Sequence, residues 1–102
     1  MQKENILNYL TEIKSDLRQK GIEKIGLFGS FAKDEASPFS DIDIAIQLQK
    51  EYLKKNDVWE YFNLIENIKE KLLKKFSRKV DVYDLDSTGN IRNTISRDVI
   101  YV

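Results

Sequence analysis

The amino-acid sequence predicts an α+β fold in which helices back a small mixed β-sheet. Two long stretches, residues 4–20 and 57–76, place apolar residues at spacings of three and four, as one face of a helix requires. Three shorter stretches, residues 23–28, 41–48 and 79–85, are apolar or alternate with period two, which is typical of strands. Because a helix connects the second and third of these strands, we expect helices to cover one face of the sheet.

The first helix is predicted over residues 4–20 and ends at Gly21, a residue that favours helix C-termini. The apolar face of this helix comprises Ile6, Leu7, Leu10, Ile13 and Leu17. The strand at 23–28 follows and ends at Gly29 and Ser30. Residues 33–40 are rich in charged residues, serine and proline, so we expect a loop there.

The second strand, residues 41–48, reads DIDIAIQL and alternates throughout. One face of this strand carries Ile42, Ile44, Ile46 and Leu48. The other face carries Asp41, Asp43, Ala45 and Gln47. The pattern leaves open whether the first two strands pair antiparallel or splay apart.

The second helix, residues 57–76, has either Asn56 or Asp57 as its N-cap. Its apolar residues are predicted to pack in the core, and this prediction includes Trp59 and Phe62.

Residues 79–85, KVDVYDL, predict a third strand. Residues 90–102 predict a short helix followed by the apolar run VIYV. We find no repeat and no internal linker, and 102 residues fit a single domain covering residues 1–102.

The composition limits the chemistry that the chain can perform. It has 17 basic and 17 acidic residues, and this balance argues against stable nucleic-acid binding. It has no cysteine and no histidine, so catalysis must use carboxylates, lysines, hydroxyls and a bound metal. The sequence shows neither a signal peptide nor a transmembrane stretch, so we expect a cytoplasmic protein that does not associate with a membrane.

The two aspartates of the second strand form a candidate metal site. Because side chains at i and i+2 leave the same face of a strand, Asp41 and Asp43 lie about 6.6 Å apart along the backbone. Their charges repel, and a divalent cation between them reverses that effect. Asp81 of the third strand is expected on the same face, and three carboxylates can hold two Mg²⁺ ions for phosphoryl transfer.

The segment GSFAK, which follows the first strand, forms a candidate phosphate site. Gly29 lets the backbone approach a ligand, and Ser30 offers a hydroxyl and an N–H group. Lys33 can add a positive charge for a phosphate. Taken singly, such a turn or a pair of aspartates is more often structural, so the inference depends on their ordered combination.

That combination resembles the minimal nucleotidyltransferases (MNT) of the DNA polymerase β-like nucleotidyltransferase superfamily. The family pattern of G-S, a basic residue, S-D-I-D and a later strand aspartate is matched here by Gly29-Ser30-Phe31-Ala32-Lys33, Ser40-Asp41-Ile42-Asp43-Ile44 and Val80-Asp81-Val82. The resemblance covers nearly the whole chain, and it is specific because three separated elements agree in order and spacing. It implies the polymerase β-like nucleotidyltransferase fold.

The resemblance also implies roles for individual residues. Asp41, Asp43 and Asp81 are the implied catalytic residues and ligands of two Mg²⁺ ions. The implied nucleotide-binding residues are Gly29, Ser30, Lys33 and Ser40. Lys33 stands where the family often has arginine, and Asp34 stands where glycine is common, which adds a negative charge near the phosphates.

Small members of this family often act with a helical HEPN (higher eukaryotes and prokaryotes nucleotide-binding) partner, an RNase toxin. The resemblance implies an antitoxin that transfers AMP from ATP to a tyrosine of such a partner, within a hetero-oligomer. Two alternatives stay open: neutralisation of the partner by binding alone, and nucleotidyl transfer to a small molecule or to RNA.

Overall fold

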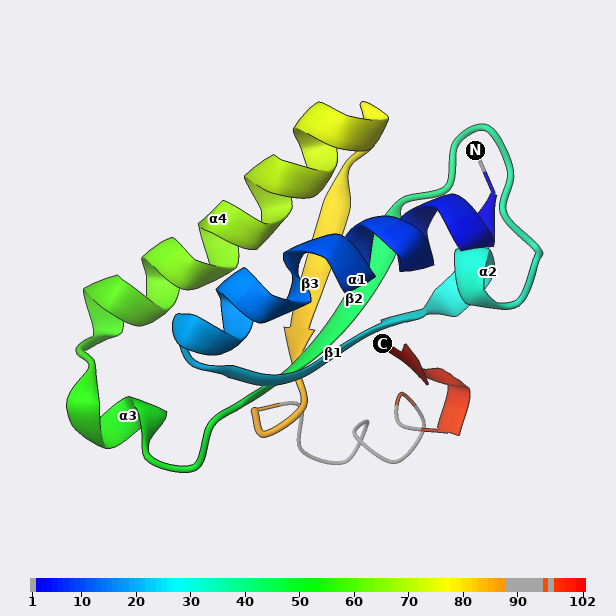
Figure 1. Cartoon of the computed structure of the whole chain (residues 1–102). Helices are drawn as coiled ribbons and strands as arrows, with labels where there is room; N and C mark the ends of the chain where they lie inside the picture. The colour runs from blue at the N-terminus through cyan, green and yellow to red at the C-terminus, as the bar shows by residue number, and fades with distance from the viewer. Residues whose placement is uncertain (1, 88–94, 96) are drawn as a thin grey trace.

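The fold is built on a mixed four-stranded sheet with the strand order β3-β2-β1-β4. The computed structural model in Figure 1 describes residues 2–87, 95 and 97–102. β1 (Ile22–Phe28) pairs antiparallel with β2 (Ile42–Leu48), which settles the alternative that the sequence left open. β2 pairs parallel with β3 (Val80–Asp84), and β4 (Ile100–Tyr101) pairs antiparallel with β1.

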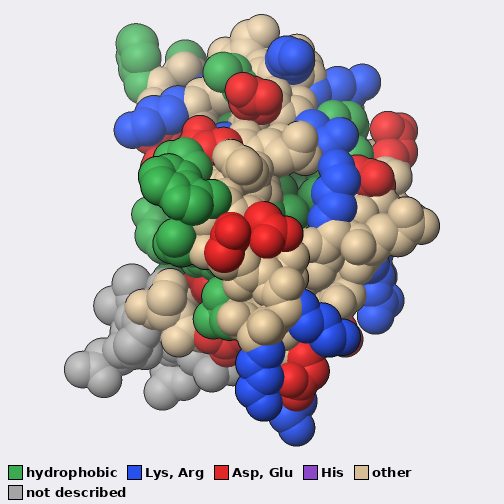
Figure 2. All heavy atoms as spheres, turned by 90° about the vertical axis from the view of Figure 1, so that its left-hand side faces the viewer, with side chains coloured by type: hydrophobic (Ala, Val, Ile, Leu, Met, Phe, Trp, Pro, Cys, Tyr) green, Lys and Arg blue, Asp and Glu red, His purple; other side chains and the backbone are tan. Residues whose placement is uncertain are grey.

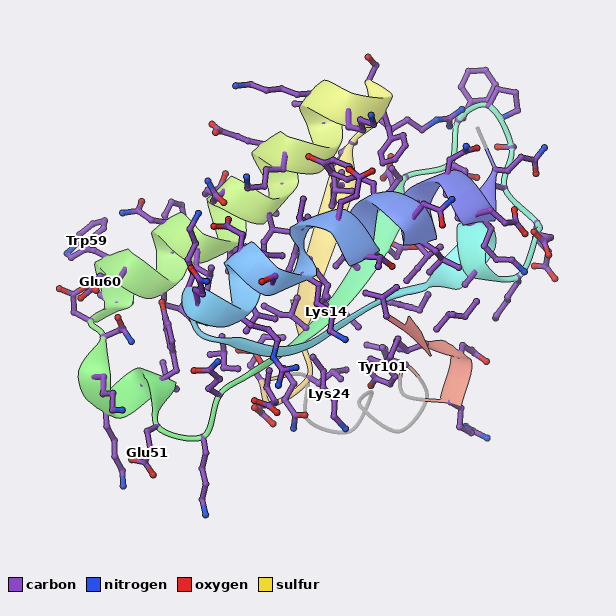
Figure 3. The ribbon with its side chains drawn as sticks, in the orientation of Figure 1. Lys14, Lys24, Glu51, Trp59, Glu60 and Tyr101 are labelled. Carbon is purple, nitrogen blue, oxygen red and sulfur yellow. The ribbon has the colours of Figure 1, made fainter. Side chains whose placement is uncertain are left out.

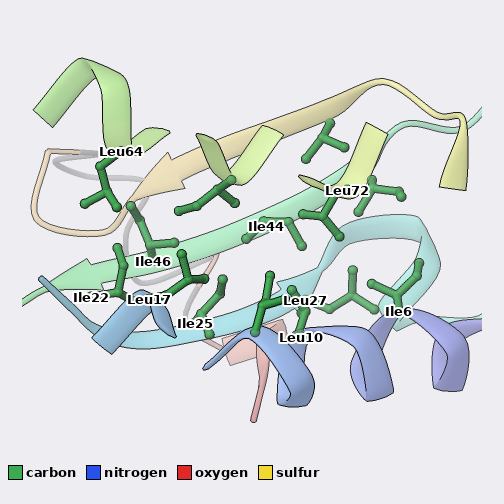
Figure 4. Packing of buried hydrophobic residues seen from close by; sticks show 14 of the residues in the cluster. Ile6, Leu10, Leu17, Ile22, Ile25, Leu27, Ile44, Ile46, Leu64 and Leu72 are labelled. Carbon is green, nitrogen blue, oxygen red and sulfur yellow. The ribbon is translucent and has the colours of Figure 1, made fainter. Parts of the chain in front are cut away.

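Two long helices, α1 (Lys3–Gln19) and α4 (Val58–Phe76), lie on the same face of the sheet (Figure 1). Their buried side chains meet the apolar face of β2 in one continuous core, which Figure 4 shows from close by. The fully buried members include Ile6, Leu10, Leu17, Ile42, Ile44, Ile46, Ile68 and Leu72. The period-two and helical patterns therefore predicted correctly the residues of β2 and α1 that face the helix-covered core. On the other face of β2, Ala45 is also fully buried, in a second small cluster with Leu85 and Ile95.

Both ends of α4 are set by local hydrogen bonding. The Asp57 carboxylate accepts a hydrogen bond from the N–H of Glu60 at 2.9 Å, and the Glu60 carboxylate accepts one from the N–H of Asp57 at 3.2 Å. This capping box identifies Asp57, rather than Asn56, as the N-cap and stabilises the helix by about 1 kcal/mol. Ser77 ends the helix in the left-handed conformation, with φ of 55°.

Two short helices complete the described elements. α2 (Gly29–Ala32) follows β1 directly, and α3 (Tyr52–Lys55) lies between β2 and α4. No pattern in the sequence had predicted α3. Most of the short helix predicted within residues 90–102 lies outside the described residues, whereas part of the apolar run VIYV forms β4.

The prediction that Trp59 and Phe62 pack in the core is wrong. Trp59 is 72% exposed and Phe62 is 55% exposed. The buried residues of α4 are Leu64, Ile68 and Leu72, and Tyr61 packs beside them, so Trp59 and Phe62 lie on another side of the helix. Figure 3 shows Trp59 projecting away from the body at the start of α4, and Figure 2 shows hydrophobic side chains gathered on this side of the molecule. We define the exposed apolar patch as Leu53, Val58, Trp59 and Phe62.

Within the described residues, none of the helices combines the length and the apolar character that crossing a membrane requires.

Candidate functional site

The candidate site lies on the face of the sheet opposite the long helices, where β2 and β3 begin (Figure 1). Ile42 and Ile44 point into the helix-covered core, so Asp43 between them points to the other face, where it is partly exposed. In the parallel ladder Asp43 lies directly beside Asp81, and in the antiparallel ladder it lies beside Phe28. Neighbouring strands are about 4.8 Å apart, so this register brings two carboxylates together on one face.

Gly29 brings the predicted phosphate turn against the predicted metal site. Its φ is 75°, a left-handed conformation that side chains disfavour. A Cβ atom at this position would collide with the Oδ2 atom of Asp43. The glycine therefore allows α2 to start in direct contact with the Asp43 carboxylate, with Ser30 as the next residue.

Like charges dominate the electrostatics around Asp43. Burial, and then the charges of Asp81 and Asp41, raise the pKa of the Asp43 carboxyl above its ordinary value of 3.8. The three carboxylates thus repel one another through space, and a bound cation would relieve the repulsion. Hard carboxylate oxygens are also the ligands that Mg²⁺ prefers, so the chemistry of the donor set fits this ion.

The three acids do not form a ready-made metal cage. No group of three or more carboxylates within the described ranges is close enough together to hold an ion. Asp41 lies just before β2, and its Oδ2 atom is 4.0 Å from the Nζ atom of Lys79. Because Mg²⁺ usually binds one or two carboxylates together with phosphate oxygens and water, the arrangement suits an ion that arrives with its nucleotide.

Tyr83 belongs to the surroundings of the site, although it is not among the site residues predicted from the sequence. Its ring packs edge-on against Phe28, with 5.1 Å between ring centres. Burial, and then the charges of Asp43, Asp81 and Asp41, raise the pKa of Tyr83. Its spacing of two from Asp81 was the signal in the sequence, because such residues share a face of a strand.

The other acid of β3, Asp84, points to the helix side and has a separate role. It is 8% exposed and accepts hydrogen bonds from the Tyr61 hydroxyl and the Asp86 N–H, both at 2.9 Å. Burial first, and then this hydrogen bond, raise the pKa of Tyr61 to about 12. Asp84 is therefore a structural acid that joins α4 to β3.

Lys33 and Asp34 are both engaged by distant parts of the chain. The Nζ atom of Lys33 lies 3.5 Å from the Oδ2 atom of Asp98. Asp34 has φ of 59°, and its carboxylate accepts a hydrogen bond from the Lys3 Nζ atom of α1 at 3.0 Å. The positive φ explains why glycine is suited to position 34. The ion pair with Lys3 offsets the negative charge that Asp34 adds.

Ser40 contributes its hydroxyl to the loop. Its Oγ atom accepts a hydrogen bond from the Ser37 N–H at 2.8 Å, and its carbonyl oxygen accepts one from Arg78 at 3.0 Å. In this structure the Ser40 hydroxyl thus holds the turn that leads into Asp41.

Comparisons with known proteins identify the family of the chain. The family model for polymerase beta nucleotidyltransferases matches residues 11–102. The chain is 32% identical over 102 residues to the protein adenylyltransferase MntA of Thermococcus cleftensis, covering 97% of this chain and 94% of the relative.

Two solved structures share the fold. One is a minimal nucleotidyltransferase, with a TM-score of 0.72 and 21% identity over 98% of this chain and 95% of that one. The other is a complex of a tri-AMPylated HEPN toxin from Shewanella oneidensis with its MNT antitoxin, with a TM-score of 0.60 and 22% identity over 97% of this chain and 70% of that one. With its mixed sheet, its Gly-Ser turn and its strand aspartates, the chain belongs to the polymerase beta nucleotidyltransferase family and is a nucleotidyltransferase.

Proposed function

We propose that this chain is a Mg²⁺-dependent antitoxin that transfers AMP from ATP to a tyrosine hydroxyl of a HEPN toxin. One observation carries the proposal: Asp43 lies beside Asp81 and, from the other side, touches the backbone of Gly29. A carboxylate pair in direct contact with a Gly-Ser turn suits a nucleoside triphosphate with its metal.

Each residue has a defined task in this proposal. Asp41, Asp43 and Asp81 would hold two Mg²⁺ ions, which when bound would stabilise negative charge on the phosphate oxygens. Gly29 and Ser30 bind the phosphates through their backbone N–H groups and the Ser30 hydroxyl. Lys33 leaves Asp98 to pair with a phosphate, and Ser40 holds the turn before Asp41.

The transfer is an in-line displacement at the α-phosphorus of ATP. The oxygen of the acceptor hydroxyl forms a bond to this phosphorus, and the bond from phosphorus to the bridging oxygen breaks. Pyrophosphate leaves with that electron pair, and the hydroxyl proton passes to the Asp81 carboxylate. Negative charge develops in the transition state, and fixed polar groups that stabilise this charge usually make the largest contribution to the rate enhancement of an enzyme.

The comparisons support the acceptor and the partner. The relative from Thermococcus cleftensis is named a protein adenylyltransferase, and in the Shewanella oneidensis complex the HEPN toxin carries three AMP groups. We propose a HEPN protein as the partner in a hetero-oligomer and a cytoplasmic location, with residues 1–102 forming one nucleotidyltransferase domain.

A transfer assay tests the proposal. The chain is mixed with labelled ATP, Mg²⁺ and a HEPN toxin, and we expect label on a tyrosine of that toxin. The variant Asp41→Asn/Asp43→Asn should transfer none. Asp16→Asn is the matched control, because this exposed α1 acid pairs only with Lys20 at 3.1 Å among the described ion pairs. An unlabelled partner, or equal labelling by the double variant, would contradict the proposal.

A second candidate function, neutralisation by binding alone, is favoured by the exposed apolar patch on α3 and α4. The double variant separates the two functions in cells. If it protects cells from the toxin as well as the native chain does, binding is sufficient. If it forms the complex but does not protect, the transfer is required.

A further inference from the structure

One arginine outside the family motif, Arg78, connects the loop before Asp41 to the body of the protein. Arg78 lies between the end of α4 and the start of β3. Its Nη1 atom donates to three carbonyl oxygens, at 3.3 Å to Ser37, 3.0 Å to Pro38 and 3.0 Å to Ser40. One guanidinium nitrogen thus gathers the backbone of a whole turn.

The same side chain also contacts α2. The guanidinium carbon lies 5.4 Å from the centre of the Phe31 ring, which is 5% exposed. A cation over an aromatic face at this distance is attracted to the ring, and a planar guanidinium can stack there while it donates hydrogen bonds. Arg78 therefore joins the loop to the short helix that starts at Gly29.

The loop has little else to hold it in place. Its other hydrogen bonds are internal, between Ser37, Phe39 and Ser40. Phe39, its large apolar residue, is 93% exposed and anchors nothing. Across the described part of the chain, the hydrogen bonds of Arg78 are the only ones that join residues 37–40 to another segment.

Asp41 is the acid that depends most on this loop. Asp43 and Asp81 are fixed by ladder pairing in the sheet, whereas Asp41 precedes the first ladder pair, Ile42 with Val80. Its position therefore depends on the turn that ends at Ser40 as well as on Ile42, whose N–H donates to the Lys79 carbonyl at 3.0 Å.

We propose that Arg78 is a positioning residue for the transferase reaction. By holding the carbonyl groups of Ser37–Ser40 and the ring of Phe31, it sets the distance between Asp41 and the turn at Gly29. The inference rests on the proposed metal role of Asp41. A shift of about 1 Å in such a group can lower a rate by roughly 10²-fold, so a remote anchor can control the chemistry.

Three variants test this inference at a temperature well below unfolding. Arg78→Ala removes the anchor. Arg78→Lys keeps the charge but loses the planar fork. Lys74→Ala, in the last turn of α4, removes a nearby positive charge without touching the loop and is the matched control.

Two measurements that need no transfer decide the outcome. In Arg78→Ala, the amide hydrogens of Ser37, Phe39 and Ser40 should exchange at least about tenfold faster, and the Mg²⁺ concentration at half-maximal binding, measured by calorimetry with ATP present, should rise severalfold. In active protein, kcat should fall about 10–10²-fold with little change in KM for ATP. Arg78→Lys should recover part of each effect, and Lys74→Ala should match the native chain.

A merely structural role would lower the unfolding temperature without moving these properties of the folded protein. Equal exchange rates, or equal Mg²⁺ midpoints in the native and Arg78→Ala chains, would overturn the inference. Neither measurement needs transfer to occur, so a native chain that transfers no AMP would refute the proposed function while exchange and Mg²⁺ binding still decide the role of Arg78.

Discussion

The two faces of β2 carry residues with opposite effects on the folded state. Ile42, Ile44 and Ile46 are fully buried beneath the helices, and each favours folding by leaving water. Asp43, between them in sequence, faces the other way into a field of like charge from Asp81 and Asp41. Alternate residues of one strand therefore serve stability and chemistry separately, and a substitution should affect one property with little effect on the other.

The largest effect on stability is expected at Ile44. Ile44→Ala removes buried methyl and methylene groups from a fully buried position and should lower the free energy of unfolding by about 2–5 kcal/mol. Denaturant titration followed by circular dichroism measures this loss. Leu53→Ala, at a leucine that is 68% exposed, is the control and should change the value by less than about 0.5 kcal/mol. Similar losses in both variants would contradict the division between the faces.

The next largest effect is expected at Gly29, where a substitution should affect both the stability of the fold and the binding of the nucleotide. Gly29→Ala forces a side chain into a backbone conformation with φ of 75° and against the Asp43 carboxylate. We expect a loss of about 1–3 kcal/mol in the free energy of unfolding, together with loss of ATP binding in calorimetry. Ser30→Ala, one residue later, is the control for stability and should unfold like the native chain. A fully stable Gly29→Ala variant would show that the turn can move away from Asp43.

A smaller effect, of opposite sign, is expected at Asp43. Because the folded protein raises the pKa of this carboxyl, the folded state holds its proton more tightly than the unfolded state does. The stability that this proton contributes is present below pH 4 and is lost as the pH rises through the raised value. Asparagine at position 43 carries no charge, so the Asp43→Asn variant does not lose this stability as the pH rises. Near pH 7 the variant should be more stable than the native chain by less than about 1 kcal/mol, since solvent screens partly exposed charges.

Thermal unfolding of the native chain and the Asp43→Asn variant between pH 3.5 and 7 measures this effect. The difference between their unfolding temperatures should grow as the pH rises. Mg²⁺ with ATP should raise the unfolding temperature of the native chain more than that of the variant. A variant that is less stable than the native chain at pH 7 would contradict the repulsion among the three acids.

The sequence allowed both faces of β2 to be predicted because the period of a strand is two. It also predicted that the two halves of the site belong together, through the spacing shared with a known family. It could not predict the pairing directions of the strands, since parallel and antiparallel pairs can show the same hydrophobic alternation. Arg78 was missed because its acceptors are backbone carbonyls 38–41 positions earlier in the chain, and such contacts leave no pattern in side-chain types.

The error at Trp59 and Phe62 has a physical cause. Apolar residues occur on more than one side of α4, so helical periodicity alone did not identify the side that faces the sheet. The buried residues are Leu64, Ile68 and Leu72, with Tyr61 packed beside them, whereas Trp59 and Phe62 lie on another side of the helix.

The smallest effect on stability is therefore expected at Trp59. This residue extends the comparison of buried and exposed positions from the strand β2 to the helix α4. Because its side chain is 72% exposed, Trp59→Ser should change the free energy of unfolding by less than about 0.5 kcal/mol. Leu64→Ala, at a residue of the same helix that is 5% exposed, should lose about 2–5 kcal/mol. Circular dichroism must follow the unfolding, since Trp59 is the one tryptophan of the chain. A loss at Trp59 comparable to that at Leu64 would mean that the Trp59 side chain packs on the protein in solution. A negligible loss would show that Trp59 does not stabilise the monomer, as we expect for a surface that binds a partner.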